Sequence, residues 1–510
     1  MNLIDLLEKA AEKNGKKTFL IEDKKKPVSF GDTRKRVIEL ASGLSKLGVK
    51  KGERVALLLN NSPEFIYSYF AAQYLGAEII PLNTFLRLEE IIYILNDSNA
   101  VALITSPDFY PVLKDFSISR ANRLKHIIST NDLKEIKCLN FQQVLSDTPF
   151  TPAVPNDTDT AAIIYTSGTT GHPKGAMLTH SNLVSNVEQS IKAINIKPSD
   201  RFIIFLPMFH AFSFTVCVLI PLYVNCKLTI IKSIQPFSNI IKAIMKDRIS
   251  IFVAIPPVYN VLAGKKIPRW LLWLNPIRLC ISGAAPLAGE VLKNFEKKFR
   301  VPLMEGYGLS EASPVVSVNP FDNTRKAGSV GKPIPGVEVR IVDENGKDAE
   351  QGSAGEIVIK GPNIMKGYYN RETETAEVLK DGWLFTGDIG RIDTDGYLFI
   401  MDRKKDLILV NGMNLYPREV EEVLYRHPAV ADAAVVPKKD SVHGEIPIGV
   451  ILLKEGASAT DAELRKFCKP HLANFKVPHR FEFWAEIPRN ATGKILKREI
   501  KRIINEQQQG

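Results

Sequence analysis

Glycines, hydroxyls and one lysine gather just after a hydrophobic stretch in the first third of the chain. The apolar residues 161–165 predict a buried strand, and the segment Thr166–Gly175 follows it directly. Its three glycines allow backbone conformations that side chains forbid, and a close approach to a ligand. Its free N–H groups, its hydroxyls and the Lys174 ammonium can together bind phosphate. We interpret the segment as a phosphate-binding loop rather than a polar surface turn, although it lacks the Walker spacing.

The segment Glu305–Glu311, EGYGLSE, carries an aromatic ring, a hydroxyl and a carboxylate close together. Tyr307 offers a face on which a base can stack. Ser310 offers a hydroxyl to phosphate, and Glu311 offers the hard oxygen that Mg²⁺ prefers. A lone glutamate in a loop is usually only hydrated, so this motif indicates a nucleotide only together with the loop described above.

Two further short motifs suit the base and the sugar of a nucleotide. The small residues of Gly283–Pro286, GAAP, follow the predicted strand 279–282 and would form a flat wall for a purine. In Trp383–Gly390, WLFTGDIG, the carboxylate of Asp388 can accept hydrogen bonds from both ribose hydroxyls. Taken alone, the first motif is typical of a tight turn and the second of a β-turn.

Taken in their order along the chain, the motifs resemble those of the adenylate-forming enzymes, which include acyl-CoA synthetases, luciferases and peptide-synthetase adenylation domains. The resemblance covers nearly the whole chain, with Ser310 where threonine is more common. It implies Mg²⁺ on Thr166 and Glu311. It also implies that ATP or AMP is bound by Thr166, Ser167, Gly168, Thr169, Thr170, Gly171, Lys174, Gly283, Ala284, Ala285, Glu305, Gly306, Tyr307, Gly308, Ser310, Asp388, Arg403 and Lys494.

Three residues beyond position 403 gain their roles from the resemblance alone. It implies that Lys494 reaches across an interdomain cleft and stabilises the charge that develops as a carboxylate attacks the α-phosphate. It makes Lys405 the hinge. It places Gly412 in the CoA tunnel, where a residue without a side chain leaves room for the pantetheine arm. Without the resemblance, Lys494 in its Gly-Lys turn is typical of a solvent-exposed turn residue. Gly412 is then typical of a turn between a strand and a helix.

The aromatic segment 206–214, LPMFHAFSF, contains His210. A histidine in such surroundings is typical of a core residue. The resemblance places it beside the acyl carboxylate, with Ala211 and Phe214 near the entrance for the chain, and it completes a catalytic set of Lys494, His210, Thr166 and Glu311. We assign no acid–base chemistry to His210.

Predicted strands and helices alternate on both sides of the phosphate-binding loop. This rhythm predicts an α/β fold in which two similar sheets pack as one large domain. The expected helices are 33–47, 63–75, 88–95, 212–223 and 238–246, and the expected strands are 55–59, 77–81, 101–105, 202–206, 228–231 and 251–255.

The last third of the chain changes character. Glycines and short alternating strands predict a β-rich subdomain at about 325–400, within an AMP-binding N-terminal domain of residues 1–402. The charged run Asp402–Asp406 predicts a hinge. Residues 403–510 predict a small, mobile α+β domain, a size that suits an independent unit.

Composition narrows the functional class. The chain has 510 residues, 45% of them hydrophobic and 24% charged, which predicts a soluble protein of at least two domains. The net charge of +11 suits anionic ligands such as nucleotides and CoA. Zinc spacings and basic arms are absent from the sequence, which argues against nucleic acid. Five scattered cysteines indicate a reducing compartment, and the sequence indicates no oligomeric state.

Contact with a membrane stays open at this stage. The N-terminus lacks the apolar core of a signal peptide, and the most apolar window, 209–224, is shorter than a membrane span, so we expect a cytoplasmic protein. The run Pro268–Pro276 carries two tryptophans and three leucines. We expect it to pack in the core; peripheral contact with the inner face of a membrane is the alternative.

The resemblance therefore predicts an AMP-forming acid–thiol ligase that joins a fatty acid to ATP and then to CoA. The apolar pocket walls, at 209–214, 234–258 and 309–316, favour a fatty acid over a polar one. Two alternatives are an aryl-acid CoA ligase, of the coumarate or benzoate type, and a ligase that loads a carrier protein. A purely nucleotide-binding regulator is disfavoured, because Lys494, Glu311 and Asp388 are all present.

Overall fold

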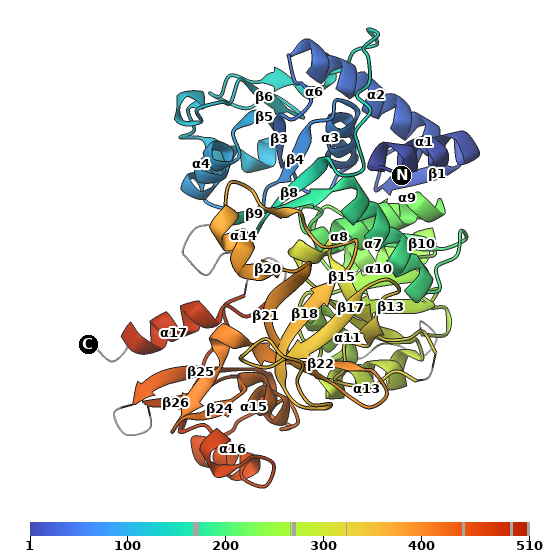
Figure 1. Cartoon of the computed structure of the whole chain (residues 1–510). Coiled ribbons are helices and arrows are strands. Elements are labelled where there is room, and N and C mark those ends of the chain that lie inside the picture. The colour runs from blue at the N-terminus through green and yellow to red at the C-terminus, as the bar shows by residue number, and fades with distance from the viewer. Residues whose placement is uncertain are drawn as a thin grey trace.

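One large sheet forms the top of the molecule, a second large sheet and a β-rich layer lie side by side in its middle, and a small C-terminal unit lies at the lower left (Figure 1). The computed structural model describes residues 1–166, 173–265, 267, 272–322, 324–440, 444–489 and 493–506. The predicted α/β class, with two similar sheets and a small α+β unit at the C-terminus, is confirmed.

The first large sheet has eight strands in the order β19-β9-β8-β4-β3-β5-β6-β7. Its central strands are parallel, and the short apolar runs that form them are buried, as is typical of a sheet covered on both faces. The strands are β3 Arg54–Leu58, β4 Glu78–Pro81, β5 Ala100–Thr105, β6 His126–Ser129, β7 Leu139–Asn140, β8 Thr160–Thr166, β9 Lys174–Thr179 and β19 Gly367–Tyr368. The accompanying helices are α2 Phe30–Lys46, α3 Pro63–Tyr74, α4 Leu88–Asp97, α5 Tyr110–Leu113 and α6 Phe141–Val144.

The predicted phosphate-binding loop joins two antiparallel strands of this sheet. Thr166 at the end of β8 pairs in register with Lys174 at the start of β9. The sequence predicted β8 and did not predict β9, because the segment KGAMLT shows no regular alternation of apolar and polar residues. The hairpin holds the two ends of the loop next to each other, where β8 ends and β9 begins.

The second large sheet has nine strands in the order β16-β15-β14-β13-β12-β10-β11-β1-β2. Its strands are β1 Thr18–Glu22, β2 Val28–Ser29, β10 Arg201–Ile204, β11 Lys227–Ile230, β12 Ile251–Ala254, β13 Leu279–Ser282, β14 Leu303–Gly308, β15 Val315–Val318 and β16 Lys332–Pro333. Helices α1 Leu3–Asn14, α7 His180–Ala193, α8 Ala211–Phe214, α9 Ile220–Val224, α10 Ser238–Asp247, α11 Pro256–Gly264 and α13 Gly289–Phe299 accompany it. The expected helix 212–223 is divided by a π-helical turn, Thr215–Leu219. This turn precedes Pro221, which has no N–H to continue the α-helical ladder.

A five-stranded antiparallel sheet follows where the β-rich subdomain was expected. It comprises β17 Glu338–Val342, β18 Gly355–Lys360, β20 Leu379–Lys380, β21 Trp383–Ile392 and β22 Leu398–Arg403, with helix α14 Glu372–Val378 alongside. Two short strands of the same stretch of sequence belong elsewhere, because β16 extends the nine-stranded sheet and β19 extends the eight-stranded one. The β-rich layer is thus tied to both large sheets.

The C-terminal unit has a hydrophobic core of its own. Among the described residues, its two buried clusters contain no residue before Ile408. Its strands are β23 Ile408–Val410, β24 Met413–Leu415, β25 Val430–Asp440, β26 Gly444–Leu453 and β27 Arg480–Phe483, and its helices are α15 Pro417–Leu424, α16 Asp461–Cys468 and α17 Lys497–Glu506. A separate core lets such a unit move as a body.

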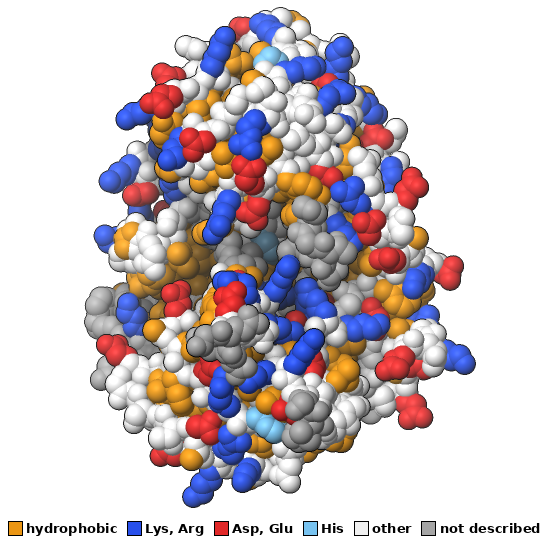
Figure 2. All heavy atoms as spheres, turned by 90° about the vertical axis from the view of Figure 1, so that its left-hand side faces the viewer, with side chains coloured by type: hydrophobic (Ala, Val, Ile, Leu, Met, Phe, Trp, Pro, Cys, Tyr) orange, Lys and Arg blue, Asp and Glu red, His pale blue; other side chains and the backbone are white. Residues whose placement is uncertain are grey.

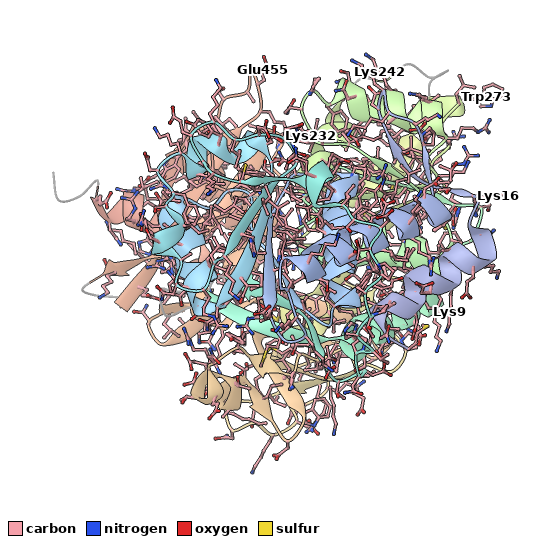
Figure 3. All side chains as sticks on the ribbon, turned by 90° about the horizontal axis from the view of Figure 1, so that it is seen from above. Lys9, Lys16, Lys232, Lys242, Trp273 and Glu455 are labelled. Atoms are coloured by element: carbon pink, nitrogen blue, oxygen red, sulfur yellow. The ribbon has the colours of Figure 1, made fainter. Side chains whose placement is uncertain are left out.

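Trp273, in the described part of the tryptophan-rich run at 268–276, is not packed as expected. The side chain of Trp273 is 86% exposed, and it points outward at the edge of the molecule in Figure 3. The prediction of core packing is therefore wrong for Trp273, because this residue lies on the surface connection between α11 and β13; Trp270 lies outside the described residues. Within the described part of the chain, no helix is long and apolar enough to cross a membrane.

Candidate active site

A cavity of about 460 Å³ lies between the large part of the molecule and the C-terminal unit. Its walls come from the start of α11, the turn after β13, the end of β14, strands β21 and β22, helix α15 and the segment before α17. Lysine and arginine side chains gather around a hollow on the face shown in Figure 2. Five lysine and arginine side chains and seven aspartate and glutamate side chains line the cavity, so it presents charges of both signs. Since segments distant in sequence form this one charged pocket, it is the best candidate for a ligand-binding site.

The turn after β13 forms one wall of the cavity. Ala284 and Ala285 line it, and Ala284 has a left-handed backbone, with φ of 68°. Gly283 lies against the ring of Phe212; a Cβ there would be 2.9 Å from the Phe212 Cζ atom. The predicted small-residue wall is therefore present, and Gly283 is required by the close approach of an aromatic ring.

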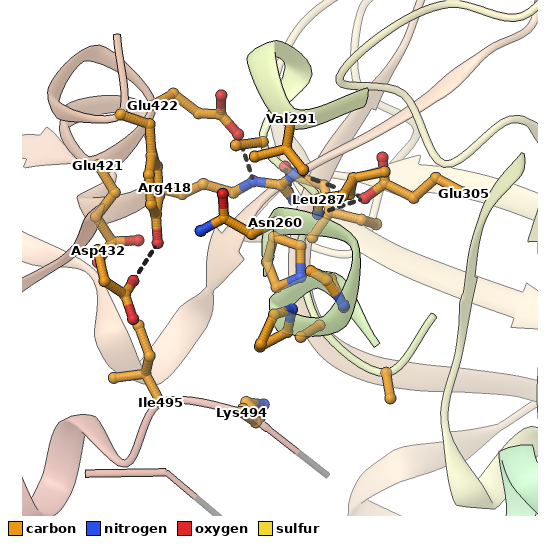
Figure 4. Close-up of a pocket in the computed structure, with 18 of the residues that line it drawn as sticks. Asn260, Leu287, Val291, Glu305, Arg418, Glu421, Glu422, Asp432, Lys494 and Ile495 are labelled. Atoms are coloured by element: carbon orange, nitrogen blue, oxygen red, sulfur yellow. Dashed lines mark hydrogen bonds and ion pairs between the residues drawn. The ribbon is translucent and has the colours of Figure 1, made fainter. Parts of the chain in front are cut away.

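Glu305, on β14, is a buried residue of the cavity lining beside this turn. Its side chain is only 1% exposed, and its Oε1 atom accepts a hydrogen bond from the Leu287 N–H at 2.9 Å (Figure 4). Its Oε2 atom has no hydrogen-bond partner among the described residues. Burial raises the pKa of Glu305 to about 7, although the Arg418 charge opposes that shift. An acceptor of this kind, facing an enclosed cavity, can receive an N–H from a ligand.

Tyr307, Asp388 and Arg403 meet in the cavity. Tyr307 donates its hydroxyl to Asp388 Oδ2 at 2.6 Å, and Arg403 Nε lies 3.2 Å from Asp388 Oδ1. The pairing of β21 with β22 places Asp388 opposite Arg403 and so fixes this contact. Burial, followed by the Asp388 charge, raises the pKa of Tyr307 well above its usual value. A carboxylate accepts several hydrogen bonds, so Asp388 can hold these partners and bind a sugar hydroxyl as well.

Thr166 and Glu311, separated by 145 residues in sequence, come together at the end of β8. The Thr166 hydroxyl donates to Glu311 Oε1 at 3.5 Å, and the Tyr368 hydroxyl donates to the same oxygen at 3.0 Å. Two oxygen-bearing side chains at this separation form a donor set that fits Mg²⁺. The sequence did not predict this role of Tyr368. The surrounding segment GYYNRETE contains no pattern that indicates a contact with Glu311.

Lys174 lies next to this pair. Its ammonium stands 5.6 Å from the centre of the Tyr368 ring and 4.0 Å from Glu374 Oε1. Five predicted residues of the phosphate-binding loop lie outside the described residues, namely Ser167, Gly168, Thr169, Thr170 and Gly171. The described structure thus provides the two ends of the predicted loop, at Thr166 and Lys174.

A hydrogen-bonded cluster around Asp97 holds the residues that flank the loop. Tyr165 donates its hydroxyl to Asp97 Oδ2 at 2.7 Å, and Arg371 Nη2 donates to Asp97 Oδ1 at 2.7 Å. Tyr93 donates its hydroxyl to the Pro173 carbonyl at 3.5 Å and accepts a hydrogen bond from Arg371 at 3.3 Å. The cluster therefore joins α4, β8 and the segment before α14, and no sequence pattern predicts it.

Lys494 lines the cavity from the C-terminal unit. Burial, followed by the Arg403 charge, lowers the pKa of its ammonium to about 8. The preceding Gly493 has φ of 76°, and a Cβ there would lie 2.6 Å from Ile255 Cδ1 on the large part of the molecule. Glycine at this position therefore lets the lysine-bearing segment approach the opposite wall.

Lys405 and Gly412 lie outside the lining of this cavity among the described residues. Lys405 belongs to a short 3₁₀ turn, Lys404–Asp406, and burial lowers its pKa. Gly412 is exposed in the turn between β23 and β24, with φ of 77°. In this orientation of the C-terminal unit, the cavity receives Lys494 and not Gly412.

His210, Ala211 and Phe214 form a separate group at the start of α8. His210 is half-buried, and its Nδ1 atom accepts a hydrogen bond from the Phe212 N–H at 3.3 Å. Burial lowers the pKa of His210 to about 4, so the ring is neutral near pH 7. The ring of Phe214 packs against Tyr69 in the core, tilted by 33° with 4.2 Å between the ring centres. The structure does not bring these three residues into the lining of the interdomain cavity.

Two family models match most of the chain. Residues 7–369 match the family model described as AMP-binding enzyme, and residues 419–494 match that of the AMP-binding enzyme C-terminal domain. The chain is 35% identical to a long-chain-fatty-acid–CoA ligase of Bacillus subtilis, over 93% of this chain and 90% of the relative. It is also 35% identical to a 4-coumarate–CoA ligase of Humulus lupulus, over 94% and 90%.

A solved structure agrees over the full length. The anthranilate CoA ligase AuaEII, in complex with anthranoyl-AMP, superposes with a TM-score of 0.93 at 26% identity, over 100% of this chain and 98% of that one.

Proposed function

Because this chain belongs to the AMP-binding enzyme family, we propose that it activates a fatty acid with ATP and transfers the acyl group to CoA. In the first half-reaction, a carboxylate oxygen attacks the α-phosphate of ATP, the bond to the β-phosphate breaks and pyrophosphate leaves. In the second, the sulfur of CoA attacks the acyl carbon, the thiol proton is released and AMP leaves. The observation that carries the proposal is the convergence of Glu305, Tyr307, Asp388 and Lys494 on one interdomain cavity.

The nucleotide would lie with its base between the Ala284–Ala285 wall and Tyr307. Glu305 can accept a hydrogen bond from the exocyclic amino group of adenine, because one of its buried oxygens has no partner among the described residues. Asp388 and Arg403 can hold the ribose hydroxyls. The phosphates would extend toward Thr166 and Lys174, at the two ends of the predicted loop.

Mg²⁺ would be held by Thr166 and Glu311, whose oxygens suit it. When bound, Mg²⁺ neutralises phosphate charge during displacement at phosphorus. Tyr368 holds one oxygen of Glu311, and Lys174 contributes a positive charge nearby. These side chains fix the position of the phosphate groups, which is the main task of a protein in such displacements.

Lys494 supplies charge stabilisation in the first half-reaction. Its ammonium lines the same cavity as Asp388 and Tyr307, and an ion–charge interaction against the walls of a protein cavity is stronger than in bulk solvent. Neither half-reaction requires a covalent bond to the protein. Positioning and electrostatics can therefore account for the whole chemistry.

We propose a domain division at the run Asp402–Asp406, with residues 1–402 binding the nucleotide and residues 403–510 moving about this hinge. Lys494 would face the cavity for adenylation, and Gly412 would face it for thioester formation. The separate hydrophobic core of the C-terminal unit supports this proposal, since it lets the unit rotate without unfolding.

A fatty acid is the proposed acyl substrate, with His210, Ala211 and Phe214 at the acyl pocket. The buried, apolar surroundings of α8 support it, as does the relative named as a long-chain-fatty-acid–CoA ligase. An aryl acid is the second candidate, because a relative named as a 4-coumarate–CoA ligase is equally similar.

One assay tests the function and separates these candidates. AMP and pyrophosphate release are measured with CoA across saturated fatty acids of increasing chain length, and across coumarate and benzoate. We expect release with medium or long fatty acids and little with aryl acids. The reverse order would assign the chain to aryl acids, and no release with any acid would refute the proposal. A parallel assay without CoA and with an acyl carrier protein tests carrier loading.

We also propose peripheral contact with anionic membranes through the exposed apolar side chains Val261, Trp273 and Leu274. Trp273 is a side chain that favours the membrane interface, and the net charge of +11 favours anionic lipid. Flotation with vesicles containing phosphatidylserine should recover less of Trp273→Ala than of wild type. Phe483→Ala, which removes an exposed aromatic ring of the C-terminal unit, is the control. Equal flotation of all three proteins would exclude this contact.

A further inference from the structure

Arg418 crosses the cavity from the C-terminal unit to the large part of the molecule. It lies in the first turn of α15, its side chain is 10% exposed, and it points toward Glu305 on β14 (Figure 4). Its Nη2 atom lies 4.0 Å from Glu305 Oε1, which pairs two buried, opposite charges. The pair joins the proposed mobile unit to the wall on which the adenine would lie.

The other contacts of Arg418 lie close to the proposed hinge. Its Nη1 atom donates to the Ile400 carbonyl at 2.9 Å, and its backbone N–H donates to Asp402 Oδ2 at 2.9 Å. Its Nε atom also lies 3.9 Å from Glu422, on the same helix. Of these four contacts, those to Ile400 and Asp402 lead to β22 next to the hinge, the one to Glu422 stays within α15, and the one to Glu305 reaches β14. A rotation of the C-terminal unit about residues 402–406 would therefore separate Arg418 from Glu305.

The cost of losing this contact falls on Glu305. The carboxylate is held by one N–H, from Leu287, and is otherwise enclosed by the wall of the cavity. An ionised carboxylate in such a place is unfavourable unless a positive charge accompanies it. When the C-terminal unit rotates away, Glu305 remains on β14 without its guanidinium, so the rotation has to overcome that loss or admit water.

We propose that Arg418 is a positioning residue that couples the adenine end of the cavity to the orientation of the C-terminal unit. Its pairing with Glu305 favours the orientation in which Lys494 lines the cavity, and so favours adenylation over thioester formation. The same pair favours the ionised form of Glu305, which is an acceptor for the amino group of the base. This inference rests on the proposed function, because the two half-reactions define which orientation is productive.

Half-reaction assays of a double-mutant cycle test the coupling. The variants are Arg418→Gln, Glu305→Gln and the double variant, with Arg426→Gln as the control. Arg426 is exposed and lies just beyond α15, so its substitution makes the same charge change away from the cavity. The first assay is acid-dependent exchange of pyrophosphate into ATP, and the second is thioester formation from CoA and supplied acyl-AMP.

We expect Arg418→Gln to slow pyrophosphate exchange by roughly tenfold, within the range for contacting charged side chains, and to change thioester formation by less than about twofold. In the Glu305→Gln background, the same substitution should slow exchange by less than about threefold. An equal loss in both half-reactions would overturn the proposal. So would an undiminished effect of Arg418→Gln in the Glu305→Gln background. Arg418→Lys, which keeps the charge but not the planar guanidinium, serves if the glutamine variant does not fold.

A measurement of orientation separates failure of this inference from failure of the proposed function. Fluorescent labels at Lys16, on the large part, and at Glu455, on the C-terminal unit, report energy transfer between the two; both side chains lie at the edge of the molecule in Figure 3. Arg418→Gln should shift the population of transfer efficiencies relative to wild type and Arg426→Gln, even if no acid supports exchange. Identical distributions in all three proteins would refute the coupling.

Discussion

Lys494 shows how one residue takes its chemistry from its surroundings. Taken alone in the sequence, its Gly-Lys turn is typical of a solvated surface residue. In the structure it is enclosed in the cavity near Arg403, and its pKa falls to about 8 because a charged amine is unfavourable there. A lysine is a cation below its pKa. Lys494 is therefore mostly charged at pH 7 and loses its charge as the pH rises through about 8.

This shift predicts an alkaline limb in the first half-reaction. Pyrophosphate exchange, measured without CoA, should fall as the pH rises from 7 to 9.5, because the uncharged amine no longer stabilises the transition state. Lys494→Arg should be slower at pH 7 but should lose this alkaline limb, since a guanidinium stays protonated throughout the range. An unchanged limb in the arginine variant would assign the titration to another group.

Glu305 and Asp388 illustrate the same point for carboxylates. Both belong to motifs that the sequence marked, but their partners come from other elements: Arg418 of α15 faces Glu305, and Tyr307 of β14 donates to Asp388. The nucleotide roles of these residues remain predictions. The structure adds the polar contacts through which a change at one residue would reach the next.

At the scale of elements, the short strand β19 has an effect far beyond its length. It pairs with β9 and places Tyr368 against Glu311 and over Lys174. The cluster of Asp97, Tyr165 and Arg371 fixes the same region from the side of α4 and β8. The ends of the predicted phosphate-binding loop are thus held in part by Tyr368, Asp97 and Arg371, which lie outside the motifs that the sequence marked.

Removal of the Tyr368 hydroxyl tests this support. Tyr368→Phe removes one hydrogen bond to Glu311, which is worth about 0.5–1.5 kcal/mol, so KM for Mg·ATP should rise by roughly 2- to 12-fold. The dependence on Mg²⁺ concentration should shift in the same direction. Tyr369→Phe, the same change one residue further along, is the matched control. Equal KM values in the two variants would show that Tyr368 does not position Glu311.

Prediction of the elements succeeded where local patterns were strong. The strands at 55–59, 101–105 and 251–255 correspond to β3, β5 and β12, because short apolar runs between turn residues are typical of buried parallel strands. Strands β9 and β19 were missed, since one lacks alternation and the other has only two residues. Their pairing partners, rather than their own sequences, make them strands.

At the scale of the whole molecule, the cavity exists only between two units. Its walls join residues from Pro256 to Lys497, and the C-terminal unit contributes Arg418 and Lys494. In the same arrangement Gly412 is exposed in its turn. If the unit rotates as proposed, Lys494 and Gly412 serve different half-reactions, and substitutions at the two positions should separate them.

The corresponding prediction compares two variants in the same two assays. Lys494→Ala should lose most pyrophosphate exchange yet retain thioester formation from supplied acyl-AMP, because the amine acts only at the α-phosphate. Gly412→Leu should show the reverse, since a side chain would obstruct the pantetheine arm. Because Gly412 has a left-handed backbone, a melting temperature for each variant checks that the fold is intact. A loss of both half-reactions in folded Lys494→Ala, or unchanged turnover in Gly412→Leu, would contradict the rotation.

The sequence by itself determined the fold class, the order of the motifs and the family to which the chain belongs. Each of these depends on local information: the period of apolar residues, the turn chemistry of glycine and the spacing within a motif. Only the tertiary structure decided that Tyr368 and Thr166 share Glu311, that Arg418 faces Glu305 and that Trp273 lies on the surface. These contacts join segments far apart in the chain. They follow from how whole sheets and units pack, which no local pattern encodes.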